Sequence, residues 1–153
     1  MINMISYEEF KKVEIKAGKI LSAEKVPDTD KLLKLSVDFG EFEQVPIAGQ
    51  EIKLPQSVEE LSVKTGDSAV LQDVSNEQLQ KVSKPRNIVS GIALHFPDPS
   101  VLIGKTCMFV TNLEPRMIRG LESNGMLFAV STKEGGFSLL EPNNTIPPGT
   151  MAS

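Results

Sequence analysis

Residues 112–126 read Asn-Leu-Glu-Pro-Arg-Met-Ile-Arg-Gly-Leu-Glu-Ser-Asn-Gly-Met, and they follow the apolar run Met108-Phe109-Val110. Pro115 cannot donate to a strand ladder and has a fixed φ. Gly120 and Gly125 can adopt the positive φ values that a sharp turn requires. The stretch is therefore predicted to be a rigid loop that joins two strands.

The same stretch carries two arginines that a rigid loop can present to a ligand. Arg116 and Arg119 each offer five donors in a planar fork, which suits phosphate oxygens. Asn112, Ser123 and the backbone of Gly125 add neutral hydrogen-bonding groups nearby. The sequence therefore predicts a site for a polyanion with a defined shape.

The N-terminal third of the chain predicts a short helix followed by a long strand. Ser6 and Glu9 have the spacing of a capping box, so a helix is expected to start at Tyr7. From Val13 onward, apolar and charged residues alternate until Pro27. This alternation predicts a first strand, bent near Gly18.

A second strand is predicted from Leu33 to Asp38, where apolar residues alternate with Lys34 and Ser36. Lys34 is therefore expected on the face opposite the apolar side chains. Further strands are expected at 86–93, 104–113, 126–130 and 136–140, with a small helix before the fourth strand. Several short strands separated by Gly and Pro turns favour an all-β Greek-key barrel, although periodicity alone does not separate a barrel from a sandwich.

The charge of the chain is unusual for a nucleic-acid binder. Sixteen basic and 20 acidic residues give a net charge of −4 and a pI near 5.1. Residues 44–83 account for −3 of this charge, because they hold three lysines and six acidic residues. A nearly neutral remainder can still bind phosphates where its cations cluster on one face, since a partner responds to local potential.

No catalytic motif is found in the sequence. It has no phosphate-binding Gly-x-x-x-x-Gly-Lys loop, no His-Glu-x-x-His helix and no paired cysteines. The single cysteine, Cys107, is interpreted as a buried strand residue, and the single histidine, His95, as structural. We therefore expect no enzyme activity, no cofactor and no metal. A chain with no apolar membrane span and no signal peptide is expected to be cytoplasmic.

The pattern N-L-x-P-R-x-x-x-G-x-x-S-x-G-M in residues 112–126 resembles the tRNA-binding domain family. This family includes free-standing tRNA-binding proteins, the C-terminal appendix of methionyl-tRNA synthetases and CsaA-type chaperones. Further similar segments follow in the family's order at residues 10–20, 30–40, 85–93 and 102–105. The resemblance implies that residues 1–153 form one OB-fold domain with additional C-terminal strands and a central insertion at about 44–83.

The insertion has two interpretations. It contains enough apolar residues to be ordered, and we expect it to be rich in strand. It is either a tolerated surface insertion, which loop-closure entropy penalises only weakly, or an acidic flap that screens the binding groove or contacts another protein.

The resemblance implies a non-catalytic module that recognises the shape and phosphate backbone of tRNA. The residues that it nominates for tRNA binding are Arg116, Arg119, Asn112, Ser123, Met126, Lys31, Lys34 and Arg86. Each has a structural alternative. The two loop arginines could pair with Glu114 or Glu122, Asn112 and Ser123 could stabilise a turn, Met126 could begin a buried strand, and the remaining cations could be ordinary solvated surface.

The resemblance also implies partners. A homodimer is expected, because free-standing members of the family pair through segments outside the barrel, and methionyl-tRNA synthetase is a candidate protein partner. No membrane partner is expected.

Two alternatives to tRNA binding stay open, namely a CsaA-like dimeric chaperone for unfolded peptides and a docking or dimerisation module for a synthetase. Only 5% of residues are aromatic and tryptophan is absent, so an extended platform for stacking single strands is not expected.

Overall fold

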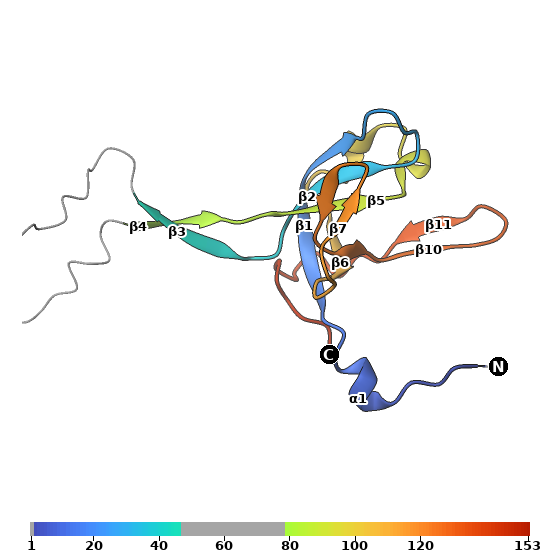
Figure 1. Cartoon of the computed structure of the whole chain (residues 1–153), viewed down its shortest axis with the longest axis horizontal. Coiled ribbons are helices and arrows are strands. Elements are labelled where there is room, and N and C mark those ends of the chain that lie inside the picture. The colour runs from blue at the N-terminus through green and yellow to red at the C-terminus, as the bar shows by residue number, and fades with distance from the viewer. Residues whose placement is uncertain (1, 47–78) are drawn as a thin grey trace, which may run out of the picture. The chain divides into compact units, whose positions relative to one another are not determined.

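The computed structural model describes residues 2–46 and 79–153. Its contacts divide the chain into two compact units, one formed by residues 1–41 and 83–153 and the other by residues 42–82. In the described part of the smaller unit, β3 (Phe42–Pro46) pairs with β4 (Leu79–Ser83) (Figure 1). Both strands fall within or beside the predicted insertion, whose central residues 47–78 lie outside the described residues.

The larger unit is mostly strand (Figure 1). Its elements are α1 (Tyr7–Phe10), β1 (Ile15–Lys25), β2 (Leu33–Asp38), β5 (Arg86–Ser90), the 3-10 helices η2 (Ala93–His95) and η3 (Pro99–Leu102), β6 (Thr106–Val110), β7 (Arg116–Ile118), β8 (Leu121–Ser123), β9 (Met126–Leu127), β10 (Ala129–Ser131) and β11 (Phe137–Leu139).

Five strands form one sheet in the order β5-β2-β1-β6-β9, which curls into a nearly closed barrel. The neighbouring strands are antiparallel, with Leu35 opposite Ile88 and Ile20 opposite Val37. At the closure, the Asn124 backbone N–H donates to the Asn87 carbonyl at 2.8 Å. A five-stranded, partly open barrel with this connectivity is an OB-fold, so the predicted fold class is confirmed. The predicted small helix before the fourth barrel strand is η3.

The barrel interior is filled by the residues that alternate inward along each strand. On β2, Leu33, Leu35 and Val37 are fully buried, whereas Lys34 and Ser36 are only partly covered. Lys34 therefore lies on the outer face, as predicted. The core also contains Ile20, Phe39, Ile88, Ile92, Ala93, Leu102, Cys107, Phe109 and Leu127. Phe39 and Phe109 meet edge to face, with ring centroids 5.3 Å apart.

Two predicted strands differ from the observed ones. The irregularity in β1 is not at Gly18 but between Ile20 and Ser22, where the register with β2 shifts by one residue. The single strand predicted at 126–130 is divided at Phe128 into β9 and β10, which belong to different sheets. The Phe128 N–H still donates to the Met108 carbonyl in the register of β6 and β9. The pairing ends there because the Met108 N–H donates to the Leu140 carbonyl and the Leu140 N–H donates to the Phe128 carbonyl.

Gly18 serves close packing instead of a bend. A Cβ atom there would lie 2.5 Å from Phe39 Cε1 and 2.6 Å from Val37 Cγ1. Gly18→Ala is therefore expected to destabilise the barrel by about 1–3 kcal/mol, as over-packed cores do. Thermal unfolding measures this change. Gly91→Ala is the matched control, because a Cβ at Gly91 meets nothing within 4 Å; equal melting temperatures for the two variants would contradict the packing role.

The C-terminal segment lies beside the start of β1. The Ala17 N–H donates to the Thr150 carbonyl and the Ala152 N–H to the Ile15 carbonyl, both at 2.8 Å. The C-terminal segment thus extends the barrel sheet along β1. The predicted capping box of α1 is confirmed, with the Glu9 N–H donating to Ser6 Oγ at 3.2 Å and the Ser6 N–H to Glu9 Oε2 at 2.7 Å. None of the α1 residues is buried.

Within the described residues, the chain contains no helix whose length and apolar character would let it cross a membrane.

Candidate nucleic-acid interface

The ligand-binding face of an OB-fold is the outer side of its second and third strands, together with the loops that flank them. In this chain those strands are β2 and β5, and the flanking segments are residues 26–32 and 111–125. The second segment lies against β5, because the buried Ser123 hydroxyl accepts a hydrogen bond from the Val89 N–H at 3.0 Å. It therefore borders the expected binding face.

The sequence predicted a rigid loop at residues 112–126. In the structure this stretch contains a β-hairpin. β7 and β8 pair with Arg116 opposite Ser123 and Ile118 opposite Leu121. The two-residue turn consists of Arg119 and Gly120, with φ values of +51° and +78°. Positive φ at both central positions defines a type I′ turn, the tightest hairpin connection. The positive φ predicted for Gly120 and Gly125 is confirmed.

The conformation of Arg119 is unfavourable for its residue type. Asn and Gly are preferred at the first position of a type I′ turn, and a non-glycine residue with positive φ carries backbone strain. Such strain concentrates at functional sites, where the side chain is retained for another reason. The strained arginine lies in the turn at the tip of the hairpin.

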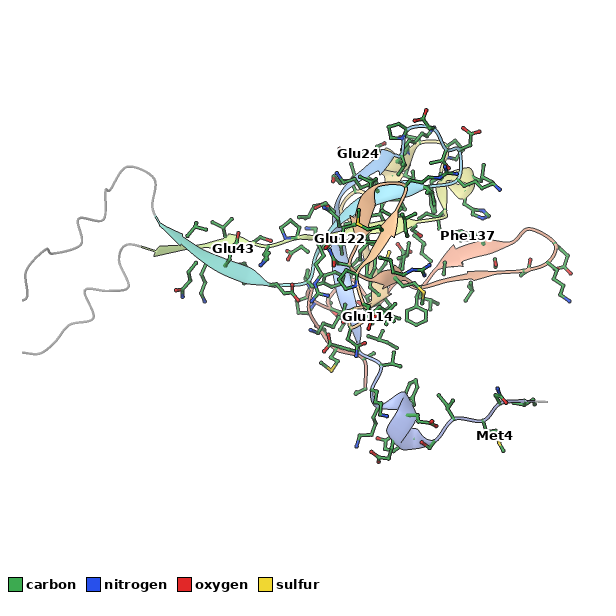
Figure 2. All side chains as sticks on the ribbon, in the orientation of Figure 1. Met4, Glu24, Glu43, Glu114, Glu122 and Phe137 are labelled. Atoms are coloured by element: carbon green, nitrogen blue, oxygen red, sulfur yellow. The ribbon has the colours of Figure 1, made fainter. Side chains whose placement is uncertain are left out.

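Both hairpin arginines are exposed. Across residues 2–46 and 79–153, no hydrogen bond or ion pair engages the guanidinium of Arg116 or Arg119. Glu114 precedes β7 and Glu122 lies on β8 (Figure 2), and Glu122 Oε1 instead accepts from Asn124 Nδ2 at 2.9 Å. The alternative in which these carboxylates neutralise the arginines is therefore absent from the described structure.

Three other residues predicted to contact tRNA, Asn112, Ser123 and Met126, differ from the arginines in their surroundings. Asn112 Oδ1 accepts from the Glu14 N–H at 2.8 Å and its Nδ2 donates to the Lys12 carbonyl at 2.5 Å, which ties it to the segment before β1. Ser123 is only 4% exposed. These bonds support the structural alternative for both residues. Met126 begins β9 beside buried Leu127, but its own side chain is 48% exposed.

The predicted lysines flank the same face. Lys31 is exposed in the segment between β1 and β2, and Lys34 is on β2, paired across the sheet with Glu24 and Val89. Within the described ranges, neither lysine takes part in an ion pair. Arg116, Arg119, Lys31 and Lys34 are thus cations available to a phosphate-bearing ligand.

Arg86 is different, because its guanidinium is held inside the protein. Nε donates to Glu41 Oε2 at 3.1 Å, Nη2 donates to Glu41 Oε1, and Nη1 donates to the Thr111 carbonyl at 2.7 Å. The side chain is 24% exposed and lies over the Phe39 ring. Arg86 was predicted as a surface cation for RNA; in the structure a carboxylate and a carbonyl already occupy its fork. We call this arrangement the Glu41–Arg86 clamp.

The hydrogen bonds around the clamp lower the pKa values of two carboxylates. The hydrogen bonds from Arg86 lower the pKa of Glu41 below its usual value. The Thr111 hydroxyl, which donates to Glu14 Oε1 at 2.6 Å, together with Lys16 lowers the pKa of Glu14. Both groups are therefore ionised at neutral pH and fix Thr111, the residue at which the chain leaves β6 for the hairpin.

A hollow of about 390 Å³ lies between β5 and the root of the hairpin. Its lining includes the clamp residues, Asn87, Leu113, Pro115 and Asn124. Asn87 and Asn124 are not among the site residues that the sequence predicts. Asn87 occurs at an outward position of a predicted strand, which was the available signal. A second hollow, of about 520 Å³, contains the Lys105–Glu141 ion pair and Asn144 and shares no lining residue with the first.

The described residues offer no group of three or more His, Cys, Asp or Glu that could hold a metal ion. Burial raises the pKa of the Cys107 thiol to about 11, so this thiol is a poor nucleophile. The exposed His95 ring stacks on Phe137 with centroids 4.0 Å apart.

Comparison with known proteins identifies the family. The family described as "Putative tRNA binding domain" matches residues 74–151, which include the hairpin, β5, β6 and the C-terminal strands. The chain therefore belongs to this tRNA-binding domain family.

Relatives by sequence are methionine–tRNA ligases. The enzyme of Methanospirillum hungatei is 38% identical over 146 residues, and that of Methanoregula boonei is 37% identical over 147 residues. These matches cover 95% and 96% of this chain but only 15% of each ligase, so the chain spans a small part of the length of these relatives.

Solved structures share the fold. A MetRS-related protein from Pyrococcus horikoshii has a TM-score of 0.68 and 29% identity, covering 99% of this chain and 100% of that one. The chaperone CsaA from Bacillus anthracis has a TM-score of 0.62 and 20% identity, with 99% of this chain and 100% of that one covered. At that identity, the likeness to CsaA shows the fold alone.

Proposed function

We propose that this chain is a non-catalytic module that binds tRNA through its shape and phosphate backbone. The observation that carries the proposal is the hairpin β7–β8 at the border of the OB-fold binding face, which presents two exposed arginines that have no partner among the described residues. Lys31 and Lys34 extend the cationic surface toward β2. Phosphate contacts of this kind position a nucleic acid without reading its sequence. A tRNA ligand would place the protein in the cytoplasm.

Salt dependence tests this function. Binding of bulk tRNA, measured by fluorescence anisotropy between low and physiological salt, is expected to weaken steeply, because each phosphate contact releases counterions. In the chaperone alternative, binding of an unfolded, mainly apolar peptide should change little over the same range. Salt-insensitive peptide binding without tRNA binding would replace the proposed function with the chaperone function.

The strained tip residue gives a separate prediction. Arg119→Asn is expected to weaken tRNA binding about tenfold, the effect of losing one charge-assisted contact. The same change should leave stability equal or higher by a few tenths of a kcal/mol, because Asn fits the type I′ turn. Titration with tRNA and thermal unfolding measure the two effects. Unchanged affinity together with a higher melting temperature would mean that the arginine is not retained for binding.

We also propose that two copies of the chain associate through the surface formed by α1 and the C-terminal segment. Tyr7, Phe10, Val13 and Met151 are exposed there around an apolar hollow of about 250 Å³. A helix that buries none of its own residues in the monomer is explained by a partner that covers it. A two-fold dimer would let two hairpins act on one tRNA with raised effective concentration.

The dimer predicts the effect of a charged residue in this surface. Phe10→Asp is expected to convert the protein to a monomer in sedimentation equilibrium, because Phe10 is 52% exposed in one copy and would be buried between two. tRNA affinity should fall with it, since avidity is lost. Leu94→Asp is the control, an exposed apolar residue on η2. A monomeric wild-type protein would refute the dimer.

A methionyl-tRNA synthetase is the proposed protein partner. The relatives are ligases of which this chain matches 15%, so a module of this kind would supply tRNA affinity to a catalytic domain, whether fused or separate. Co-purification of the chain with a synthetase that lacks such a segment would support a separate partner. A docking role without tRNA affinity would leave synthetase binding intact and tRNA titration flat.

A further inference from the structure

We propose that the hollow between β5 and the hairpin root is a subsite for one unstacked nucleotide of the bound RNA. The inference rests on the proposed function. It adds a contact to a base of the RNA, whereas the hairpin arginines contact phosphates. The hollow of about 390 Å³ falls within the roughly 300–1,000 Å³ of small-ligand sites. It combines apolar walls with amide groups, which is the chemistry that a nucleobase requires.

Hydrogen bonds hold one wall of the hollow in place. The Glu41–Arg86 clamp forms one side, fixed by the bond from Arg86 Nη1 to the Thr111 carbonyl at 2.7 Å. Leu113 and Pro115 form another, and Leu113 is 45% exposed. An exposed leucine beside a proline offers apolar contact to the flat face of a base. Because the clamp satisfies the Arg86 fork, the wall does not need a phosphate to be stable.

The rim of the hollow carries two amides. Asn87 is exposed on β5, and no hydrogen bond of its side chain occurs among the described residues. Asn124 is held next to it, because its N–H donates to the Asn87 carbonyl at 2.8 Å and its Nδ2 donates to Glu122 Oε1. An amide both donates and accepts, so the free Asn87 side chain can pair with the edge of a base.

The hollow is also next to a phosphate anchor. Arg116 follows Pro115 directly in the chain, and Pro115 lines the hollow. A nucleotide whose base entered the hollow could therefore place its phosphate at Arg116. Since taking a base out of a helical stack costs a few kcal/mol, the subsite is expected to select a nucleotide that is already unstacked in a loop or at an end.

A nucleotide titration tests the subsite directly. In ¹H–¹⁵N spectra of the full chain, millimolar adenosine 5′-monophosphate is expected to shift the side-chain amide signals of Asn87 and Asn124. Ribose 5-phosphate, which lacks the base, should leave them unmoved. No shift with either compound, or equal shifts with both, would overturn the subsite.

Variants test the subsite on tRNA. Asn87→Asp places a carboxylate at the rim and should weaken bulk tRNA binding about tenfold or more, whereas Asn144→Asp adds the same charge at the other hollow and should have little effect. Asn87→Ala, which adds no charge, should weaken binding about threefold to tenfold. If wild type binds tRNA in a salt-sensitive way and both Asn87 variants match it, only the subsite is refuted. If wild type shows no such binding, the proposed function itself fails.

Discussion

Reversing both hairpin arginines, as Arg116→Glu with Arg119→Glu, is expected to reduce tRNA affinity by about 100-fold or more. Two charge-assisted hydrogen bonds at about 1.5–3 kcal/mol each account for at least this loss, and two carboxylates facing phosphates add repulsion. The slope of the logarithm of affinity against the logarithm of salt concentration should become shallower by the amount that corresponds to about two phosphate contacts. Filter binding at low and physiological salt measures both quantities.

The control must separate local contact from net charge. Lys19→Glu with Lys133→Glu makes the same change in net charge on two exposed residues, one on β1 and one between β10 and β11. This variant should retain most of the affinity. Because both hairpin arginines are exposed, the melting temperatures of the two double variants should stay near that of wild type. Equal loss of binding in the two variants would indicate general electrostatic attraction instead of a hairpin contact.

The barrel strands could be predicted because their pattern is local. Leu33, Leu35 and Val37 alternate with polar residues over one short segment, so the face that each side chain occupies follows from the strand period alone. The split at Phe128 could not be predicted in this way, because it depends on Leu140, a distant residue that bonds to both Met108 and Phe128. Gly18 was predicted at a bend for a related reason, since its true constraint is the Phe39 ring across the core.

The site residues also differ in whether local sequence is enough to predict them. Arg116 and Arg119 could be nominated from a contiguous stretch, but the type I′ turn gave no signal because arginine replaces the usual asparagine before Gly120. Arg86 looked like another free cation because its partner, Glu41, is 45 residues away. Likewise, the structural role of Ser123 depends on its hydrogen bond from the Val89 N–H, which is distant in the sequence. Local residue type predicts which groups can bind; long-range pairing decides which are still available.

Removing the carboxylate of the clamp, as Glu41→Gln, is expected to weaken tRNA binding about fivefold to tenfold. In the structure, the Glu41–Arg86 clamp fixes the Thr111 carbonyl, from which the chain continues to the hairpin. Arg86 therefore acts as a positioning residue that works through the hairpin. If Arg86 instead bound phosphate, freeing it from Glu41 would add an available cation and tighten binding. The sign of the change thus distinguishes the two roles.

Further variants make the sign decisive. Glu141→Gln is the matched control, since it removes one ion pair, Lys105–Glu141 at 2.8 Å, with the same change in charge, and it should leave affinity within about twofold. Arg86→Lys keeps the charge but loses the fork that bridges Glu41 and Thr111, so it should weaken binding as Glu41→Gln does. Without RNA, hydrogen exchange at the amides of residues 112–119 should quicken in both clamp variants and not in Glu141→Gln. Tighter binding by Glu41→Gln would place Arg86 on the RNA and reverse the role derived from its contacts.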